Sequence, residues 1–223
     1  MSAVCASMLR FRLFDFPILV HWMFWVNMAL LGGAIGADTP QEMQSLFGWV
    51  AAAFLSIVIH ELGHAFAMRH FGDRQVGILL YAFGGLARGS RWLGRVEDII
   101  VSAAGPAVQI AIGYTLKLLL SGWQTESVLL GSFVQDFIYI SIFWALLNLL
   151  PIIPLDGGHI CRAFLGSSRV RTALIISMVC AVGIGLLALR SGSLITPLFF
   201  GMMAFNNWKE LQGQPQVPWM EGR

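Results

Sequence analysis

Charged side chains are scarce in this sequence. Asp, Glu, Lys and Arg together make up 12% of the 223 residues, which is about half of their share in an average soluble domain. Hydrophobic residues make up 57% of the chain, and its mean hydropathy is +0.73. This composition indicates an integral membrane protein and leaves little sequence for a water-soluble domain.

Cysteine is scarce as well. The three cysteines, Cys5, Cys161 and Cys180, form no Cys-x-x-Cys pair, so the sequence indicates neither a disulfide framework nor a thiolate zinc site. Charge of one sign does not accumulate, because the formal net charge is only +2. A net charge this small does not favour binding of nucleic acid, and we expect no nucleic-acid partner.

Long apolar runs, in contrast, recur along most of the chain. A helix needs about 20 apolar residues to cross the hydrocarbon core of a lipid bilayer. We predict a single membrane-embedded domain over residues 1–223, with an all-α fold of about six transmembrane helices. The first run has no small-x-small cleavage site, so we expect it to stay on the mature protein. The six predicted helices cover residues 17–37, 45–68, 98–119, 128–150, 172–189 and 193–208.

A short segment between the second and third predicted helices has a different pattern. Val76, Ile78 and Leu80 alternate with other residues ahead of Gly84 and Gly85, which is typical of a β-strand that leads into a turn. We predict a small β-hairpin there. Its backbone edge must be shielded by protein or lie at the membrane interface, because lipid offers no hydrogen-bond partners.

Lys and Arg are unevenly distributed between the loops that join the predicted helices. Twelve of the fourteen fall on one side of the membrane, and such an excess marks the cytoplasmic side. We therefore expect a multi-pass protein with both termini in the cytoplasm and a reactive site that opens toward the cytoplasm. The twelve are Arg10, Arg12, Arg69, Arg74, Arg88, Arg91, Arg95, Arg162, Arg169, Arg171, Lys209 and Arg223, and the other two are Lys117 and Arg190.

The second predicted helix contains a His-Glu-x-x-His motif at His60, Glu61 and His64. Histidines four residues apart share one face of a helix and can bind the same metal ion, while the Glu lies close enough to act as general base. A catalytic zinc site normally takes three protein ligands and keeps the fourth position open. Ionisable groups inside a membrane helix are costly and tend to mark function, so we predict a metal site that needs one more ligand.

Asp156 is the best candidate for that third ligand. It follows Pro151 and Pro154 and precedes Gly157 and Gly158. Proline stops the preceding helix, and glycine permits backbone angles that other residues avoid. The break in the helix can therefore direct the Asp156 carboxylate toward the two histidines.

The two segments resemble the signatures of the site-2 protease family, His-Glu-x-x-His followed by Asn-x-x-Pro-x-x-Pro-Leu-Asp-Gly, and both are complete. Gly105-Pro106 is similar to the family's Gly-Pro-x-x-Asn element, with Gln109 in the place of its Asn. The resemblance implies an intramembrane zinc endopeptidase, embedded in the lipid bilayer, that cuts the transmembrane helix of a membrane-protein substrate in regulated intramembrane proteolysis.

The resemblance also implies further site residues. Asn148 matches the Asn of the second signature and is expected to donate a hydrogen bond to the reaction's oxyanion or to the substrate backbone. In the family, the segment that carries Gly84 and Gly85 is thought to pair with the unwound substrate as an added strand. The chain has no room for the PDZ or nucleotide-sensing domain of some members, so we expect the minimal six-helix form, in a prokaryotic plasma membrane.

Two other functions stay open on the sequence. A catalytically silent relative would bind membrane helices without cutting them, although it would not need Glu61. A zinc transporter would need polar groups along a path through several helices, whereas the candidates here gather at one depth. Gln109, Asp136 and His159 have no assigned role at this point, and no oligomeric state is predicted.

Overall fold

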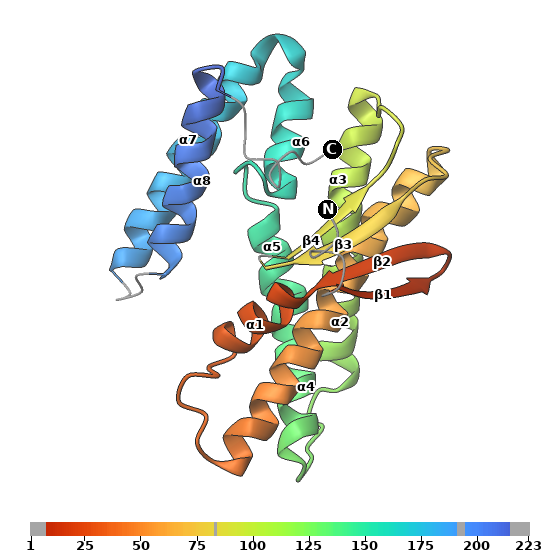
Figure 1. Cartoon of the computed structure of the whole chain (residues 1–223), viewed down its shortest axis with the longest axis vertical. Coiled ribbons are helices and arrows are strands. Elements are labelled where there is room, and N and C mark those ends of the chain that lie inside the picture. The colour runs from red at the N-terminus through yellow and green to blue at the C-terminus, as the bar shows by residue number, and fades with distance from the viewer. Residues whose placement is uncertain (1–7, 83, 191–194, 215–223) are drawn as a thin grey trace. The chain divides into compact units, whose positions relative to one another are not determined.

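The structure is a computed structural model that describes residues 8–82, 84–190 and 195–214. These residues form helices and one small β-sheet (Figure 1). The chain divides into two compact units, and each is described by itself. The first unit contains Met1–Arg91 and Ala104–Leu146, and the second contains Trp92–Ala103 and Leu147–Arg223. The expectation of a single domain stays a prediction.

The β-sheet belongs to the first unit and has four strands in the order β1-β2-β3-β4. These are β1 (Met8–Leu13), β2 (Phe16–His21), β3 (Gly77–Tyr81) and β4 (Gly84–Arg88). Strands β2 and β3 are parallel, and the other two pairs are antiparallel. Strands β3 and β4 lie in the segment for which the sequence predicts a hairpin, whereas β1 and β2 extend the sheet beyond that prediction.

The predicted membrane helix over residues 17–37 is wrong in its first part, because Phe16–His21 is strand β2. Phe16, Ile18 and Val20 are 1%, 0% and 0% exposed, and they alternate with residues that are less buried. A strand presents successive side chains to opposite faces of the sheet. The uninterrupted apolar run concealed this alternation.

Helix α1 (Trp22–Leu31) follows β2 directly. Its N-cap is His21, whose Nδ1 accepts a hydrogen bond from the Met23 amide. The ten residues of α1 span about 15 Å, which is half of the hydrocarbon core of about 30 Å. The Asn27 side-chain amide donates a hydrogen bond to the Ala82 carbonyl, so α1 is fixed to the turn between β3 and β4.

Four helical segments are long and apolar enough to cross a membrane, judged by length and composition. They are α2 (Pro40–His70), α3 (Arg95–Leu119), Val128–Asn148 and Ser167–Leu189. Helix α8 (Ile195–Leu211) has 17 residues. Within the residues that the structure describes, there are thus four candidate spans where the sequence predicts about six. The segment Val128–Asn148 consists of α4 (Val128–Tyr139), a π-helical turn (Ile140–Trp144) and α5 (Ala145–Asn148), and the segment Ser167–Leu189 consists of a 3-10 turn (Ser167–Arg169) and α7 (Val170–Leu189).

In the first unit, α2 is the central helix. It begins with a capping box in which Thr39 and Glu42 satisfy each other's backbone amides, and it packs against α4 at Gly48. A Cβ atom at Gly48 would lie 2.9 Å from the Leu129 carbonyl oxygen and from the Phe133 nitrogen. A residue without a side chain is needed there because the two helix backbones approach closely.

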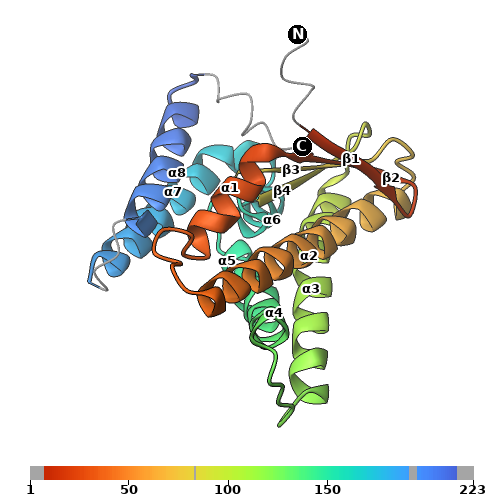
Figure 2. The ribbon, with the colours of Figure 1, turned by 60° about the horizontal axis from the view of Figure 1, so that its bottom comes forward.

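The second unit contains α6 (Asp156–Leu165), α7 and α8. Helices α7 and α8 lie side by side (Figures 1 and 2). Their apolar side chains and those of the loop before α6 form a buried cluster, which consists of Ile152, Leu155, Ala181, Phe200, Met203 and Ala204. This cluster fixes the proline-containing loop against the helix pair.

Candidate metal centre

His60 and His64 lie on one face of α2 and are 5% and 1% exposed. Their Nε2 atoms are 3.1 Å apart. Two nitrogens that bind one tetrahedral zinc ion at 2.0–2.1 Å are separated by about 3.3 Å. The distance between the two Nε2 atoms is therefore close to the distance that a shared zinc ion requires. The two imidazoles fit a metal ion as the protein places them.

A chain of buried polar groups contacts His60 at Nδ1, the ring nitrogen that does not face His64. All of these groups are in the first unit. Its Nδ1 lies 2.7 Å from Oε1 of Gln109, and Nε2 of Gln109 donates to Ser56 Oγ over 2.8 Å. Ser56 Oγ lies 2.8 Å from Ser141 Oγ. Outer hydrogen bonds of this kind set the orientation of a metal-binding imidazole.

The backbone of α3 forms a wall beside the second histidine. A Cβ atom at Gly63 would lie 2.8 Å from the Ala104 carbonyl oxygen, and one at Gly105 would lie 2.3 Å from His64 Nε2. Both glycines are required by this close approach of α2 and α3. The sequence signal at Gly105-Pro106 therefore marks a helix contact next to the metal centre.

Glu61 is 4% exposed and is covered by strand β4. A Cβ atom at Gly85 would lie 2.3 Å from Glu61 Cγ and 2.5 Å from Glu61 Oε1. The sheet lies beside the C-terminal half of α2 (Figures 1 and 2). The structure thus brings the predicted general base and the predicted substrate-binding glycine together within one unit.

Asp73 fastens this sheet to the end of α2. The carboxylate is 3% exposed and accepts hydrogen bonds from the amides of Gln75, Ser90 and Arg91 and from the Ser90 hydroxyl. Burial alone would raise the pKa of Asp73, but the hydrogen bonds from Arg91, Gln75 and Ser90 outweigh it and hold the pKa below its ordinary value. No pattern in the sequence indicates this contact.

Asp156 belongs to the second unit, where it is the first residue of α6 and is 7% exposed. The two glycines after it are required by close backbone contacts. A Cβ atom at Gly157 would lie 2.1 Å from the Leu149 carbonyl oxygen, and one at Gly158 would lie 2.5 Å from the Ile153 nitrogen. The loop between α5 and α6 therefore folds directly onto the first turn of α6.

Two polar residues on α7 and α8 hold this loop, and sequence reasoning missed both. Ser177 Oγ accepts a hydrogen bond from the Ile153 amide over 2.8 Å. Asn207 Nδ2 donates to the Ile153 carbonyl over 2.9 Å and lies 2.8 Å from Ser177 Oγ. Ser177 and Asn207 are 0% and 1% exposed. Polar side chains in otherwise apolar helices were the signal that could have identified them.

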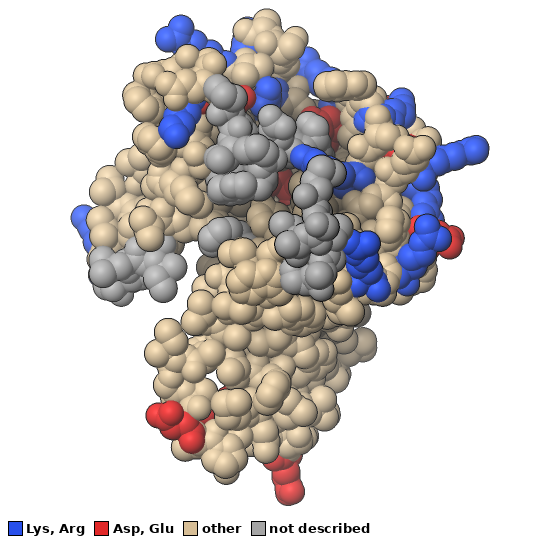
Figure 3. Space-filling view, viewed as in Figure 1, with Lys and Arg blue, Asp and Glu red and all other residues tan. Residues whose placement is uncertain are grey.

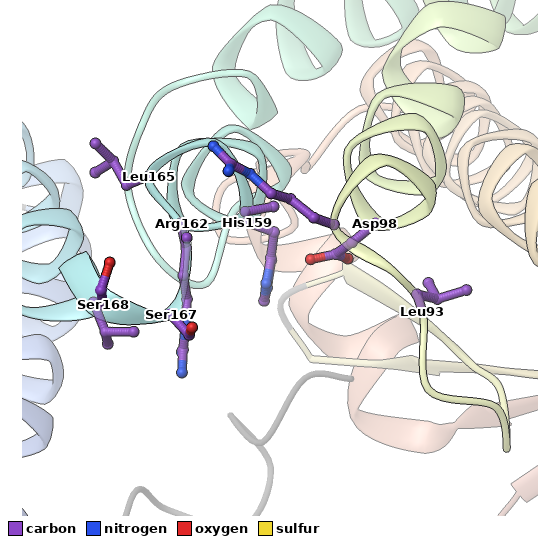
Figure 4. Close-up of a pocket in the computed structure, with 11 residues that line it drawn as sticks. Leu93, Asp98, His159, Arg162, Leu165, Ser167 and Ser168 are labelled. Atoms are coloured by element: carbon purple, nitrogen blue, oxygen red, sulfur yellow. The ribbon is translucent and has the colours of Figure 1, made fainter.

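The remaining candidate residues are described by their position and burial. Asn148 ends α5 in the second unit and is half-buried, and Gly84 begins β4 with a φ of +144°. Asp136 is half-buried on α4. His159 lies on α6, where it lines a cavity of about 580 Å³ together with Asp98 and Arg162 (Figure 4).

Comparison with known proteins gives consistent matches. The model of peptidase family M50 matches residues 122–189. Zinc metalloprotease MJ0392 of Methanocaldococcus jannaschii is 28% identical over 200 residues, which cover 90% of this chain and 55% of that protein. Rip3 of Mycobacterium tuberculosis is 28% identical over 208 residues, covering 86% of this chain and 51% of Rip3. The chain thus spans about half the length of these relatives.

A solved structure shares the fold. The site-2 protease from Methanocaldococcus jannaschii superposes with a TM-score of 0.65 at 24% identity, covering 92% of this chain and 95% of that chain. Apolar helices that bury a His-Glu-x-x-His pair are typical of a membrane-embedded metal site. The chain is thus similar in sequence to peptidase family M50 over residues 122–189 and to relatives that are named zinc metalloproteases.

Proposed function

We propose that the chain is an intramembrane zinc endopeptidase. The observation that carries this proposal is the buried pair of His60 and His64, with Nε2 atoms 3.1 Å apart and Glu61 beside them on α2. Two comparisons that cover most of the chain support it. A relative in Methanocaldococcus jannaschii is named a zinc metalloprotease, and a solved site-2 protease from the same organism has the same fold.

Asp156 is proposed as the third ligand. All three candidate ligands are buried, and a set of two imidazoles with one carboxylate is typical of catalytic zinc. The clamp of Ser177 and Asn207 on the loop before α6 supports this role, since a metal ligand must be held by its surroundings. Zinc bound by these residues would supply a Lewis acid and lower the pKa of water in its open position to about 7.

Glu61 is proposed as the general base and acid. It would take a proton from the attacking water and later give that proton to the leaving amine. Burial of its carboxylate under β4 keeps bulk water away and restricts the rotamers from which the proton transfer can occur. Asn148 is proposed to donate a hydrogen bond to the oxyanion or to the substrate backbone.

The substrate is proposed to be a transmembrane helix of another protein, cut in regulated intramembrane proteolysis. Within the described residues, β4 is the last strand of the sheet, and an exposed strand edge can bind an extended peptide through backbone hydrogen bonds. Because Gly85 of β4 contacts Glu61, a peptide paired there would pass close to the general base. The substrate helix must unwind locally to pair in this way.

The membrane orientation is proposed from charge. In the first unit, Lys and Arg side chains gather around the sheet with a few acidic side chains among them, whereas the charged side chains at the opposite end are acidic (Figure 3). Basic residues mark the cytoplasmic side, so the sheet, the C-terminal end of α2 and both termini would lie on the cytoplasmic side, in a prokaryotic plasma membrane. The lipid bilayer is thus a partner of the whole chain.

The test is to purify wild type, Glu61→Gln and Asp156→Ala in detergent, and to measure zinc content and cleavage of a reporter transmembrane peptide. We expect Glu61→Gln to keep zinc and to lose cleavage, and Asp156→Ala to lose both. Wild-type protein that binds zinc but cuts no more than Glu61→Gln would instead identify a helix-binding relative. Zinc flux into vesicles would identify a transporter.

A further inference from the structure

Two helix faces meet behind the metal centre in the first unit. On α2, Ser56 and His60 are four residues apart, and on α3, Gly105 and Gln109 have the same spacing. Residues four apart lie on one face of a helix. Gln109 is 1% exposed, and its amide lies between His60 Nδ1, at 2.7 Å from Oε1, and Ser56 Oγ, at 2.8 Å from Nε2.

The partners of the Gln109 amide decide which of its two ends faces His60. Nε2 lies 2.8 Å from Ser56 Oγ and 3.5 Å from the Ser56 carbonyl oxygen. A carbonyl oxygen can only accept, so it favours the amide nitrogen on its side. The hydroxyl of Ser56 fits this order as well, because it accepts from Gln109 and can donate to Ser141 Oγ, 2.8 Å away. The Gln109 oxygen is therefore the atom that faces His60.

An acceptor at His60 Nδ1 has a direct consequence for the imidazole. The neutral ring carries one proton, and an oxygen opposite Nδ1 retains it there as the hydrogen-bond donor. The lone pair is then on Nε2, which points at Nε2 of His64 3.1 Å away. With the amide reversed, the proton would lie on Nε2 and block metal binding through that atom.

We propose that Gln109 is a positioning residue that keeps the proton of His60 on Nδ1 and so leaves Nε2 ready for the metal ion before the metal binds. This inference rests on the proposed zinc site. Gln109 touches neither the metal nor the reacting atoms, and it acts through His60 alone. Ser56, and behind it Ser141 in the π-helical turn, hold the amide in the required orientation.

The length of the Gln109 side chain is part of this role. An Asn at this position is shorter by one methylene group, about 1.5 Å, so its oxygen would lose contact with His60 Nδ1. Glu has the length of Gln and an acceptor oxygen. Although Asn occupies the matching position of the family's motif, Glu is the conservative replacement in this chain.

The first test compares zinc affinity, by competition with a chelator, between wild type and variants at position 109. We expect Gln109→Met and Gln109→Asn to weaken zinc binding about 10- to 100-fold, the usual effect of removing such a partner, and Gln109→Glu to keep it. The matched control is Gln135→Met, which makes the same change at an exposed position of α4 and should bind zinc like wild type. The absorption spectrum of bound Co²⁺ should change in Gln109→Met and stay unchanged in Gln135→Met. Equal affinity and spectra in all variants would overturn the proposal.

The second test needs no metal and no folded variant at position 109. Metal-free wild type is labelled with ¹⁵N-histidine and studied by NMR. The His60 signals are those that disappear in His60→Gln, and the chemical shifts of the two ring nitrogens report the tautomer. We expect a protonated Nδ1, whereas a protonated Nε2 would refute the role of Gln109. If wild type shows the Nδ1 proton but binds no zinc, the proposed function fails, and only the effect of Gln109 on the tautomer of His60 stands.

Discussion

Gly85 of β4 and Glu61 of α2 lie so close together that position 85 has no space for a side chain, because a Cβ atom there would come within 2.3 Å of Glu61 Cγ. The nearest atoms all belong to the Glu61 side chain, which can rotate away. A larger residue would therefore displace the general base rather than break the sheet. The contact links strand β4, which we propose as the substrate platform, to the carboxylate that would act on the substrate.

The first prediction concerns Gly85→Ala. We expect cleavage of the reporter peptide to fall about 100-fold, since a displacement of about 1 Å at a catalytic group has an effect of that size. Zinc content should stay at the wild-type value because neither histidine is touched. Gly77→Ala on β3 is the control, since a Cβ atom there would meet Pro17 at an ordinary 3.6 Å. Wild-type cleavage by Gly85→Ala would contradict the contact.

The second prediction concerns Gly105→Ala. A Cβ atom at this position would come within 2.3 Å of His64 Nε2, the atom that would bind the metal. We expect the zinc affinity to fall at least about 10-fold, since a metal site depends on the positions of its ligands within about 0.5 Å. Gly183→Ala on α7 is the control, because a Cβ atom there would meet nothing within 4 Å. Unchanged zinc affinity in Gly105→Ala would show that α3 does not restrict His64.

The third prediction concerns Asp73→Asn. The substitution places an amide opposite backbone N–H groups and should lower the free energy of unfolding by about 2 kcal/mol at neutral pH. The pKa of Asp73 is lowered in the folded state from 3.8, so its stabilising effect is complete above that value and is lost as the pH falls through the lower, folded pKa. The difference between wild type and variant should thus shrink below about pH 4.

Unfolding in detergent, followed by circular dichroism between pH 3 and pH 8, measures this difference. Asp38→Asn, at an exposed position ahead of α2, is the control and should unfold like wild type at each pH. A difference between wild type and Asp73→Asn that stays the same down to pH 3 would contradict the assignment.

The spacing of the sequence motif predicted the shared helix face of the two histidines, whereas the apolar pattern did not predict the whole fold. The helical spacing of His60 and His64 required only local structure, and the structure has both on one face of α2. Strand β2 could not be found in this way, because its partner β3 lies about 60 residues further along the chain, with Ile18 opposite Ile78. Because Pro17 and Leu19 are apolar as well, although they lie on the less buried face of β2, the strand has the same apolar composition as a membrane helix.

The residues that hold the site residues in place could not be predicted from the sequence for a related reason. Ser56, Gln109 and Asn207 are polar residues in largely apolar helices, and only the packing of those helices shows which group each one reaches. Gln109 was visible as a departure from the family's motif, yet its partner His60 is 49 positions away. A polar side chain in a membrane helix must find a partner, but the sequence does not name that partner.

The last prediction concerns the clamp in the second unit. Asn207→Leu removes the donor to the Ile153 carbonyl, and Ser177→Ala removes the acceptor of the Ile153 amide. Each variant leaves a buried backbone group unpaired and should lower the free energy of unfolding by about 1–3 kcal/mol. Because both act on one network, the double variant should lose less than the sum of the two single losses. Ser168→Ala, at an exposed position, should change nothing, and strictly additive losses in the double variant would show that Ser177 and Asn207 act independently on the loop that leads into Asp156.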